Sequence, residues 1–194
     1  MKKLLLLFVL AISFHAVNAQ ITENDYKKLI PYLQAENFKK ANKVSEKLLA
    51  KAEGDNSEYH QMVAYINIYS AAALTSQGKM TRAELKELVT KYKNQTIFMS
   101  GHIASVNPKN TLNKTFLSNA GEKTTGYTAI ATSDFKIIMA EDIRFNEKLD
   151  LNYYFASTVR CGGKLSDFEV NMNENDPSWI LKITVSDAFI RRTK

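Results

Sequence analysis

The side chains with the most reactive chemistry are few in this sequence and lie far apart. Cys161 is the only cysteine among 194 residues, and a lone thiol acts as a nucleophile, pairs with a partner's thiol or lies buried. In a strand over residues 151–161, alternate side chains share a face, which places Cys161 with the apolar ones. These are Leu151, Tyr153, Phe155 and Val159. We therefore predict that the thiol is buried.

The residue types that bind metals do not form a recognisable site. His60 and His102 each stand without a second His or Cys at the spacing of a zinc site, and no motif around His102 or the cysteine indicates a thiol enzyme. The loop over residues 171–176 offers alternating oxygen ligands. However, Asp176 stands where a calcium loop needs glycine, and Lys182 where it needs a bidentate glutamate. We expect a solvated turn there, no metal and no cofactor.

The remaining catalytic patterns are also missing. Glu141 and Asp142 are adjacent acids, which we interpret as a surface turn. The sequence has no carboxylate pair for acid–base work, no glycine-rich phosphate loop, no nucleophile elbow and no dinucleotide fingerprint. This favours a protein that binds over one that catalyses, with an enzyme of unrecognised mechanism as an alternative.

A polar surface on two predicted strands is the candidate ligand-binding site. Its residues are Tyr154, Thr158 and Arg160 on the strand over 151–161, and Lys182 and Thr184 on the strand over 179–190. If these strands are neighbours, the five side chains form a polar, partly aromatic and mildly basic face. The alternative is that they are ordinary surface residues.

The first 19 residues have the features of a secretory signal peptide. Two lysines follow Met1, residues 4–14 are almost entirely apolar, and Ala16 to Ala19 supply small residues for cleavage. The apolar run is too short for an anchor, which needs about 20 residues to span a membrane. We therefore expect cleavage near Ala19, no transmembrane anchor, and a bacterial periplasmic or secreted protein. Loss of the two lysines lowers the formal charge from +6 to +4.

Composition and charge narrow the class of protein further. An apolar content of 45% with 7 Gly, 3 Pro and 1 Cys excludes a disordered chain, a fibrous protein and a disulfide scaffold. Residues 20–95 contain 12 basic and 9 acidic side chains, whereas residues 96–194 contain 12 and 11. The second half is therefore nearly neutral, and we assign the lysines of the first half to solvated helix faces.

The first half of the mature chain has the periodicity of helices. Apolar residues recur every three or four positions from residue 21 to residue 93, which predicts about four helices in antiparallel hairpins. We expect the first to begin near Thr22 or Asn24 and to kink or stop at Pro31. The expected N-terminal caps of the other three are Asn37, Ser57 and Thr81, the last with Glu84 in a capping box.

Residues 32–41 resemble the middle of a tetratricopeptide repeat. In that family a small turn between two helices precedes an alanine, here Ala41, that lets the helices cross closely. The resemblance covers only the helical half and implies a repeat-like pair of hairpins. A generic pair of α-hairpins is the alternative.

The second half of the chain has the period-two alternation of β-strands. It is rich in Ile, Val, Thr, Phe and Tyr, which predicts an antiparallel sheet. The expected strands cover residues 96–106, 115–118, 127–132, 135–139, 151–161, 164–170 and 179–190. Turn residues between them predict hairpins, one of which is at Gly162–Gly163.

The spacing of three of these strands resembles an OB-fold barrel. The segments that carry the resemblance are residues 97–103, 154–159 and 180–190, and it extends over residues 96–194. It implies a face that binds oligosaccharides or single-stranded nucleic acid by stacking and backbone contacts. Residues 141–150 leave room for only a short helix between the third and fourth strands. An open antiparallel sheet packed by helices is the alternative.

These patterns together predict an α+β protein in three parts. A signal peptide covers residues 1–19, a helical, tetratricopeptide-like domain covers 20–95, and an OB-like antiparallel β-barrel or curved sheet covers 96–194. We expect an exported, non-catalytic binding or interaction protein of the bacterial cell envelope, whose partner is another envelope or extracellular protein. Binding of an oligosaccharide or single-stranded nucleic acid by the β domain is the alternative.

Overall fold

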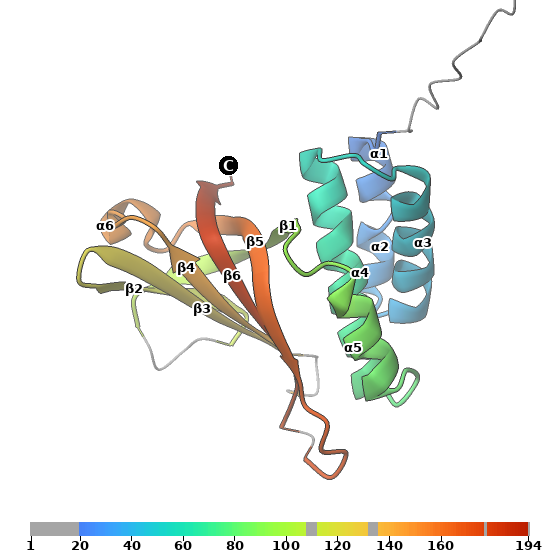
Figure 1. Cartoon of the computed structure of the whole chain (residues 1–194). Helices are drawn as coiled ribbons and strands as arrows, with labels where there is room; N and C mark the ends of the chain where they lie inside the picture. Colours follow the sequence, from blue (N-terminus) through green and yellow to red (C-terminus); the bar gives the residue numbers. More distant parts are fainter. Residues whose placement is uncertain (1–19, 108–111, 132–135, 177, 194) are drawn as a thin grey trace, which may run out of the picture.

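The computed structural model describes residues 20–107, 112–131, 136–176 and 178–193, and the expected signal peptide lies outside them. The chain is α+β, as predicted, with helices first and a mostly antiparallel six-stranded sheet after them (Figure 1). The helices are α1 (Glu23–Lys27), α2 (Ile30–Gln34), α3 (Phe38–Lys51), α4 (Glu58–Ser76), α5 (Arg82–Thr90) and the short α6 (Leu151–Tyr154). The strands are β1 (Thr96–Ser105), β2 (Lys114–Ala120), β3 (Lys123–Ala131), β4 (Ile137–Phe145), β5 (Thr158–Val170) and β6 (Trp179–Arg192).

The helices begin where the sequence predicts. The first segment is interrupted before Pro31, which stands in the first turn of α2, so it forms two short helices in place of one. The side chains of Asn37, Ser57 and Thr81 each accept a hydrogen bond from a backbone amide in the first turn of α3, α4 and α5. Glu84 completes the capping box of α5.

Helix α4 is the central helix and is buried on almost every side. It packs against α3 and α5 and also against strands β1, β4 and β6 (Figure 1). Ala71, Ala72 and Ala73 are completely buried, and their small side chains let neighbouring elements approach closely. The largest buried cluster joins apolar residues of this helix to those of the sheet, so the core is continuous across residue 95.

Every strand of the sheet has two hydrogen-bonded neighbours. The order is β1-β2-β3-β4-β6-β5, and β5 pairs again with β1. The pairs β1–β2 and β4–β6 are parallel, and the other four are antiparallel. The β1–β2 pairing is short, because it joins only residues 103–105 to residues 114–116.

The predicted hairpin at Gly162–Gly163 is wrong, because β5 continues through both residues. A Cβ at Gly162 would lie 2.4 Å from the ring of Phe189 and 2.8 Å from that of Phe98. The glycine therefore permits close packing of two aromatic rings where we had expected a turn. The ladder between β5 and β6 also shifts register beside this pair of glycines.

Two further predicted elements need correction. Residues 151–154, expected at the start of a strand, form α6 after the capping side chain of Asp150. The strand expected over 135–139 extends to Phe145 as β4, so Glu141 and Asp142 lie within the sheet and do not form a surface turn. In both places the short apolar run does not fix the type or the length of the element, and contacts with distant residues decide it.

Candidate functional site

The most apolar cavity of the described residues lies between the helical layer and the sheet. Its volume is about 300 Å³, at the small end of ligand pockets. From helices α1, α2 and α4 it is lined by Tyr26, Ile30, Leu33, Met62, Tyr65, Ile66 and Tyr69. From the β half it is lined by residues 98–102, Asn113, Ile130, Ala131 and Arg160. We call this space the helix–sheet cavity.

A chain of polar side chains runs from the wall of the cavity into the sheet. Tyr65 on α4 donates its hydroxyl hydrogen to Glu141 Oε1 of β4 at 2.7 Å. Tyr65 Oη is also 3.3 Å from Ser100 Oγ, which is 2.9 Å from His102 Nε2. The cavity lining thus includes a hydroxyl and an imidazole in contact, connected through a tyrosine to a buried carboxyl group.

Glu141 is buried among apolar side chains, with 1% of its surface exposed. Burial raises the pKa of Glu141 to about 7, and hydrogen bonds from Tyr65 and Thr128 partly oppose the rise. Thr128 is itself buried and lies 3.1 Å from the hydroxyl of Thr115. The carboxyl group therefore stays protonated to an unusually high pH and is held on two sides.

A bulge in β1 presents Ser100 to the cavity. Phe98 pairs with Gly162 and Gly101 with Arg160, so two residues of β1 lie opposite a single residue of β5. Ser100 is exposed, whereas the preceding Met99 is buried. Bulges of this kind redirect a side chain and are frequent next to functional sites.

The environment of His102 favours the neutral imidazole. Burial lowers the pKa of His102, and a hydrogen bond with the backbone of Asn113 opposes this only in part. Among the described residues, no carboxylate forms a hydrogen bond with the imidazole. Ser100 and His102 therefore form a dyad without the acidic group that orients the histidine of a catalytic triad.

Arg160 brings a positive charge to the same cavity. Its guanidinium donates to Tyr26 Oη at 3.3 Å and contacts Met62 Sδ at 3.5 Å. It also stands over the ring of Tyr26, 5.9 Å from the centroid. Its Nε atom is buried and has no hydrogen-bond partner.

The structure does not bring the five predicted ligand-binding residues together. Strands β5 and β6 are neighbours, which the prediction required, but Arg160 pairs with Arg191 whereas Lys182 pairs with Glu169. The two parts of the predicted face therefore lie toward opposite ends of the strand pair. The placements are Tyr154 in α6, Thr158 and Arg160 at the start of β5, and Lys182 and Thr184 in the first half of β6. Their role in binding stays a prediction.

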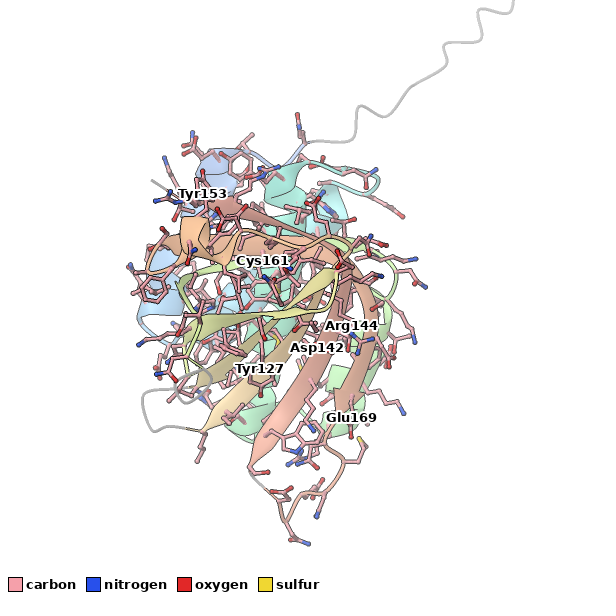
Figure 2. All side chains as sticks on the ribbon, turned by 90° about the vertical axis from the view of Figure 1, so that its left-hand side faces the viewer. Tyr127, Asp142, Arg144, Tyr153, Cys161 and Glu169 are labelled. Carbon is pink, nitrogen blue, oxygen red and sulfur yellow. The ribbon has the colours of Figure 1, made fainter. Side chains whose placement is uncertain are left out.

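Lys182 and Thr184 border a second, smaller hollow on the outer face of the sheet. Tyr127, Asp142 and Glu169 lie on this face, which looks away from the helices (Figure 2). The hollow is lined by three carboxylates, of Asp142, Asp167 and Glu169, and by one lysine. The excess of negative charge in this hollow disfavours the binding of a polyanion.

Cys161 is buried, as predicted, with 3% of its surface exposed. Burial raises the pKa of Cys161 well above its ordinary value, and the charge of Glu141 adds to the rise. A thiol in this state is a poor nucleophile.

Among the described residues, no group of three or more His, Cys, Asp or Glu side chains could hold a metal ion. None of the described helices is long and apolar enough to cross a membrane.

Sequence reasoning missed the polar chain around Glu141. One signal was available: in a strand continued to residue 145, Glu141 shares a face with Met139, Ile143 and Phe145. An acid on the apolar side of a strand is a candidate buried carboxyl group. Tyr65 had no comparable signal, because α4 is apolar on all sides and its register does not single out one face.

Comparisons with protein-family models, with curated proteins and with solved structures found no match to this chain.

Proposed function

We propose that the chain is an exported, non-catalytic binding protein of the bacterial cell envelope and that the helix–sheet cavity is its binding site for a small, mainly apolar molecule. The observation that carries this proposal is the cavity of about 300 Å³, whose aromatic and aliphatic walls hold only a few polar groups. That composition is typical of small-molecule sites, which often lie between structural layers.

Two variants test the site with a neutral probe, 4-phenyl-1-butanol. Leu33 and Leu48 are both half-buried leucines in the helical layer, and only Leu33 lines the cavity. Calorimetric titration should show binding to the parent chain and to Leu48→Trp, and loss of binding in Leu33→Trp, whose indole fills the cavity. Equal loss in both variants, or no binding by the parent chain, would refute the site.

The export part of the proposal has its own test. Expressed with its leader in a bacterium, the protein should be recovered from the envelope or the medium with Gln20 as its first residue. Recovery of the uncleaved chain from the cytoplasm would contradict it.

We propose that the sheet is a closed OB-like barrel with one additional strand. The proposal rests on strand order: without β2, the sequence β1-β3-β4-β6-β5 has the order of the five strands of that fold. In support, α6 lies between β4 and β5, at the position of the short helix in the OB-fold. Binding of an oligosaccharide or single-stranded nucleic acid to the outer face is an alternative, and the three carboxylates of the hollow there disfavour the nucleic acid. Flat titrations with both ligands at low salt would remove this alternative.

A specific surface supports binding to another protein as the second candidate function. Ile103, Tyr153 and Phe155 are large apolar side chains with 49%, 56% and 56% of their surface exposed. They lie on adjoining segments, because the backbone of Ala104 bonds to those of Ala156 and Ser157. A patch of exposed apolar side chains on these adjoining segments would be a contact site for another protein.

The partner reading is tested by capture from envelope extract. Residues 20–194 should retain a reproducible partner, and Phe155→Ser should lose it. Retention of the same partner by Phe155→Ser would exclude this surface.

An enzyme remains the third reading, and Ser100 with His102 is the pair on which it would rest. Undiminished activity of Ser100→Ala in a hydrolase screen would remove this version.

A further inference from the structure

Arg160 is the feature of the helix–sheet cavity that an apolar ligand leaves unexplained. It contacts Tyr26 Oη, the face of the Tyr26 ring and Met62 Sδ, none of which is an anion, and its Nε has no partner. Within the described part of the chain, no carboxylate forms an ion pair with it. Arg144, by contrast, is paired with Asp142 at 2.8 Å on the outer face of the sheet.

An arginine in this state is electrostatically incomplete. Guanidinium is always charged and carries five N–H donors in a fixed fork, whereas a thioether is a weak acceptor. Arg160 is half-buried and its Nε is fully buried, and even partial removal of a charge from water without a counter-charge is unfavourable. Among the described residues that line the cavity, none is acidic, and the environment of His102 favours the neutral imidazole.

The buried carboxyl group of Glu141 does not supply the missing charge. Glu141 does not line the cavity, and its Oε1 accepts the hydrogen bond from Tyr65. The cavity therefore combines apolar walls with one uncompensated positive charge.

We infer that the ligand is a monoanionic amphiphile, a carboxylate on an apolar or aromatic body. The inference rests on the proposed function and specifies its ligand. The carboxylate lies against Arg160, whose fork matches two oxygens, and the body lies along Leu33, Ile66 and Tyr69. A phosphate monoester carries a charge of about −1.5 to −2, which a single guanidinium leaves partly uncompensated among apolar walls.

Three probes that share one body separate the contributions of charge and shape. These are 4-phenylbutyrate, 4-phenyl-1-butanol and 4-phenylbutylamine, each titrated calorimetrically into residues 20–194. We expect the acid to bind at least about tenfold more tightly than the alcohol, the range of a charge-assisted hydrogen bond. The amine should bind most weakly, because its charge repels that of Arg160.

A matched pair of variants assigns the preference to one arginine. Arg160→Gln should bind acid and alcohol equally, whereas Arg144→Gln should keep the preference of the parent chain. Circular dichroism of both variants checks that they fold, and the comparison of acid with alcohol in the parent chain needs no variant. Equal binding of acid and alcohol by the parent chain overturns the inference and leaves the apolar site standing. Absence of binding by all three probes overturns the proposed function as well.

Discussion

Replacing Glu141 with glutamine should change how the stability of the protein depends on pH. The side chain is 1% exposed and accepts a hydrogen bond from Tyr65 at 2.7 Å. Burial raises the pKa of Glu141 from 4.5 to about 7. A carboxyl group with a raised pKa binds its proton more tightly in the folded than in the unfolded chain. Its contribution to stability is therefore complete below about pH 4.5 and is lost as pH rises to about 7.

The size of this effect follows from the same values. A difference of about 2.5 pH units between folded and unfolded chain, at 1.36 kcal/mol each, corresponds to roughly 3 kcal/mol. Between about pH 5 and about pH 8, the part lost is about 2 to 3 kcal/mol. Glutamine keeps an oxygen for Tyr65 but adds a buried amide, which costs about 1–3 kcal/mol at every pH. This cost does not vary with pH. The pH dependence of the difference in unfolding free energy between variant and parent therefore reports the ionisation of Glu141 alone.

Urea unfolding of Glu141→Gln and the parent chain, followed by circular dichroism from about pH 5 to about pH 8, measures the effect. From about pH 5 to about pH 8, the free energy of unfolding of the variant should rise by about 2 to 3 kcal/mol relative to that of the parent. The control is Glu169→Gln, whose side chain is 67% exposed on the outer face of the sheet; its difference should stay within about 0.5 kcal/mol. A difference for Glu141→Gln that is the same at both ends of the range would refute the reasoning.

Two further predictions concern packing around β5. Gly162→Ala should destabilise the protein by about 1–3 kcal/mol in urea unfolding, because the added Cβ would lie 2.4 Å from the ring of Phe189. Gly101→Ala, whose Cβ meets its nearest atom at 3.4 Å, is the control and should be close to neutral; equal effects would contradict the packing argument. The thiol of Cys161, 3% exposed, should react with Ellman's reagent only after unfolding, and rapid reaction of the native protein would contradict its burial.

The helical half could be predicted closely from the sequence because its signals are local. The caps at Asn37, Ser57 and Thr81 need only neighbouring backbone amides, and a helix accepts a proline only in its first turn, which is where Pro31 stands in α2. The burial of Cys161 was also predicted correctly. The same parity argument fails for Tyr153, which lies in α6 and is 56% exposed.

The β half and the candidate site depend on contacts between distant residues. Glycine is common in turns, so the sequence predicts a turn at Gly162. Only the close approach of the Phe98 and Phe189 rings shows that this residue lies within a strand. The polar chain joins Tyr65 of a helix to Glu141 of a strand, 76 positions later. No local pattern identifies such a pair, so the cavity and its polar wall could not be predicted from the sequence.

Methyl NMR of the protein labelled with [¹³C-methyl]methionine tests the binding site most directly. Met62 and Met99 line the helix–sheet cavity, whereas Met80 and Met172 lie elsewhere. During titration with 4-phenylbutyrate, the signals of Met62 and Met99 should shift and saturate together, while those of Met80 and Met172 stay in place. Shifts confined to Met80 or Met172, or no shift at saturating probe, would contradict the account.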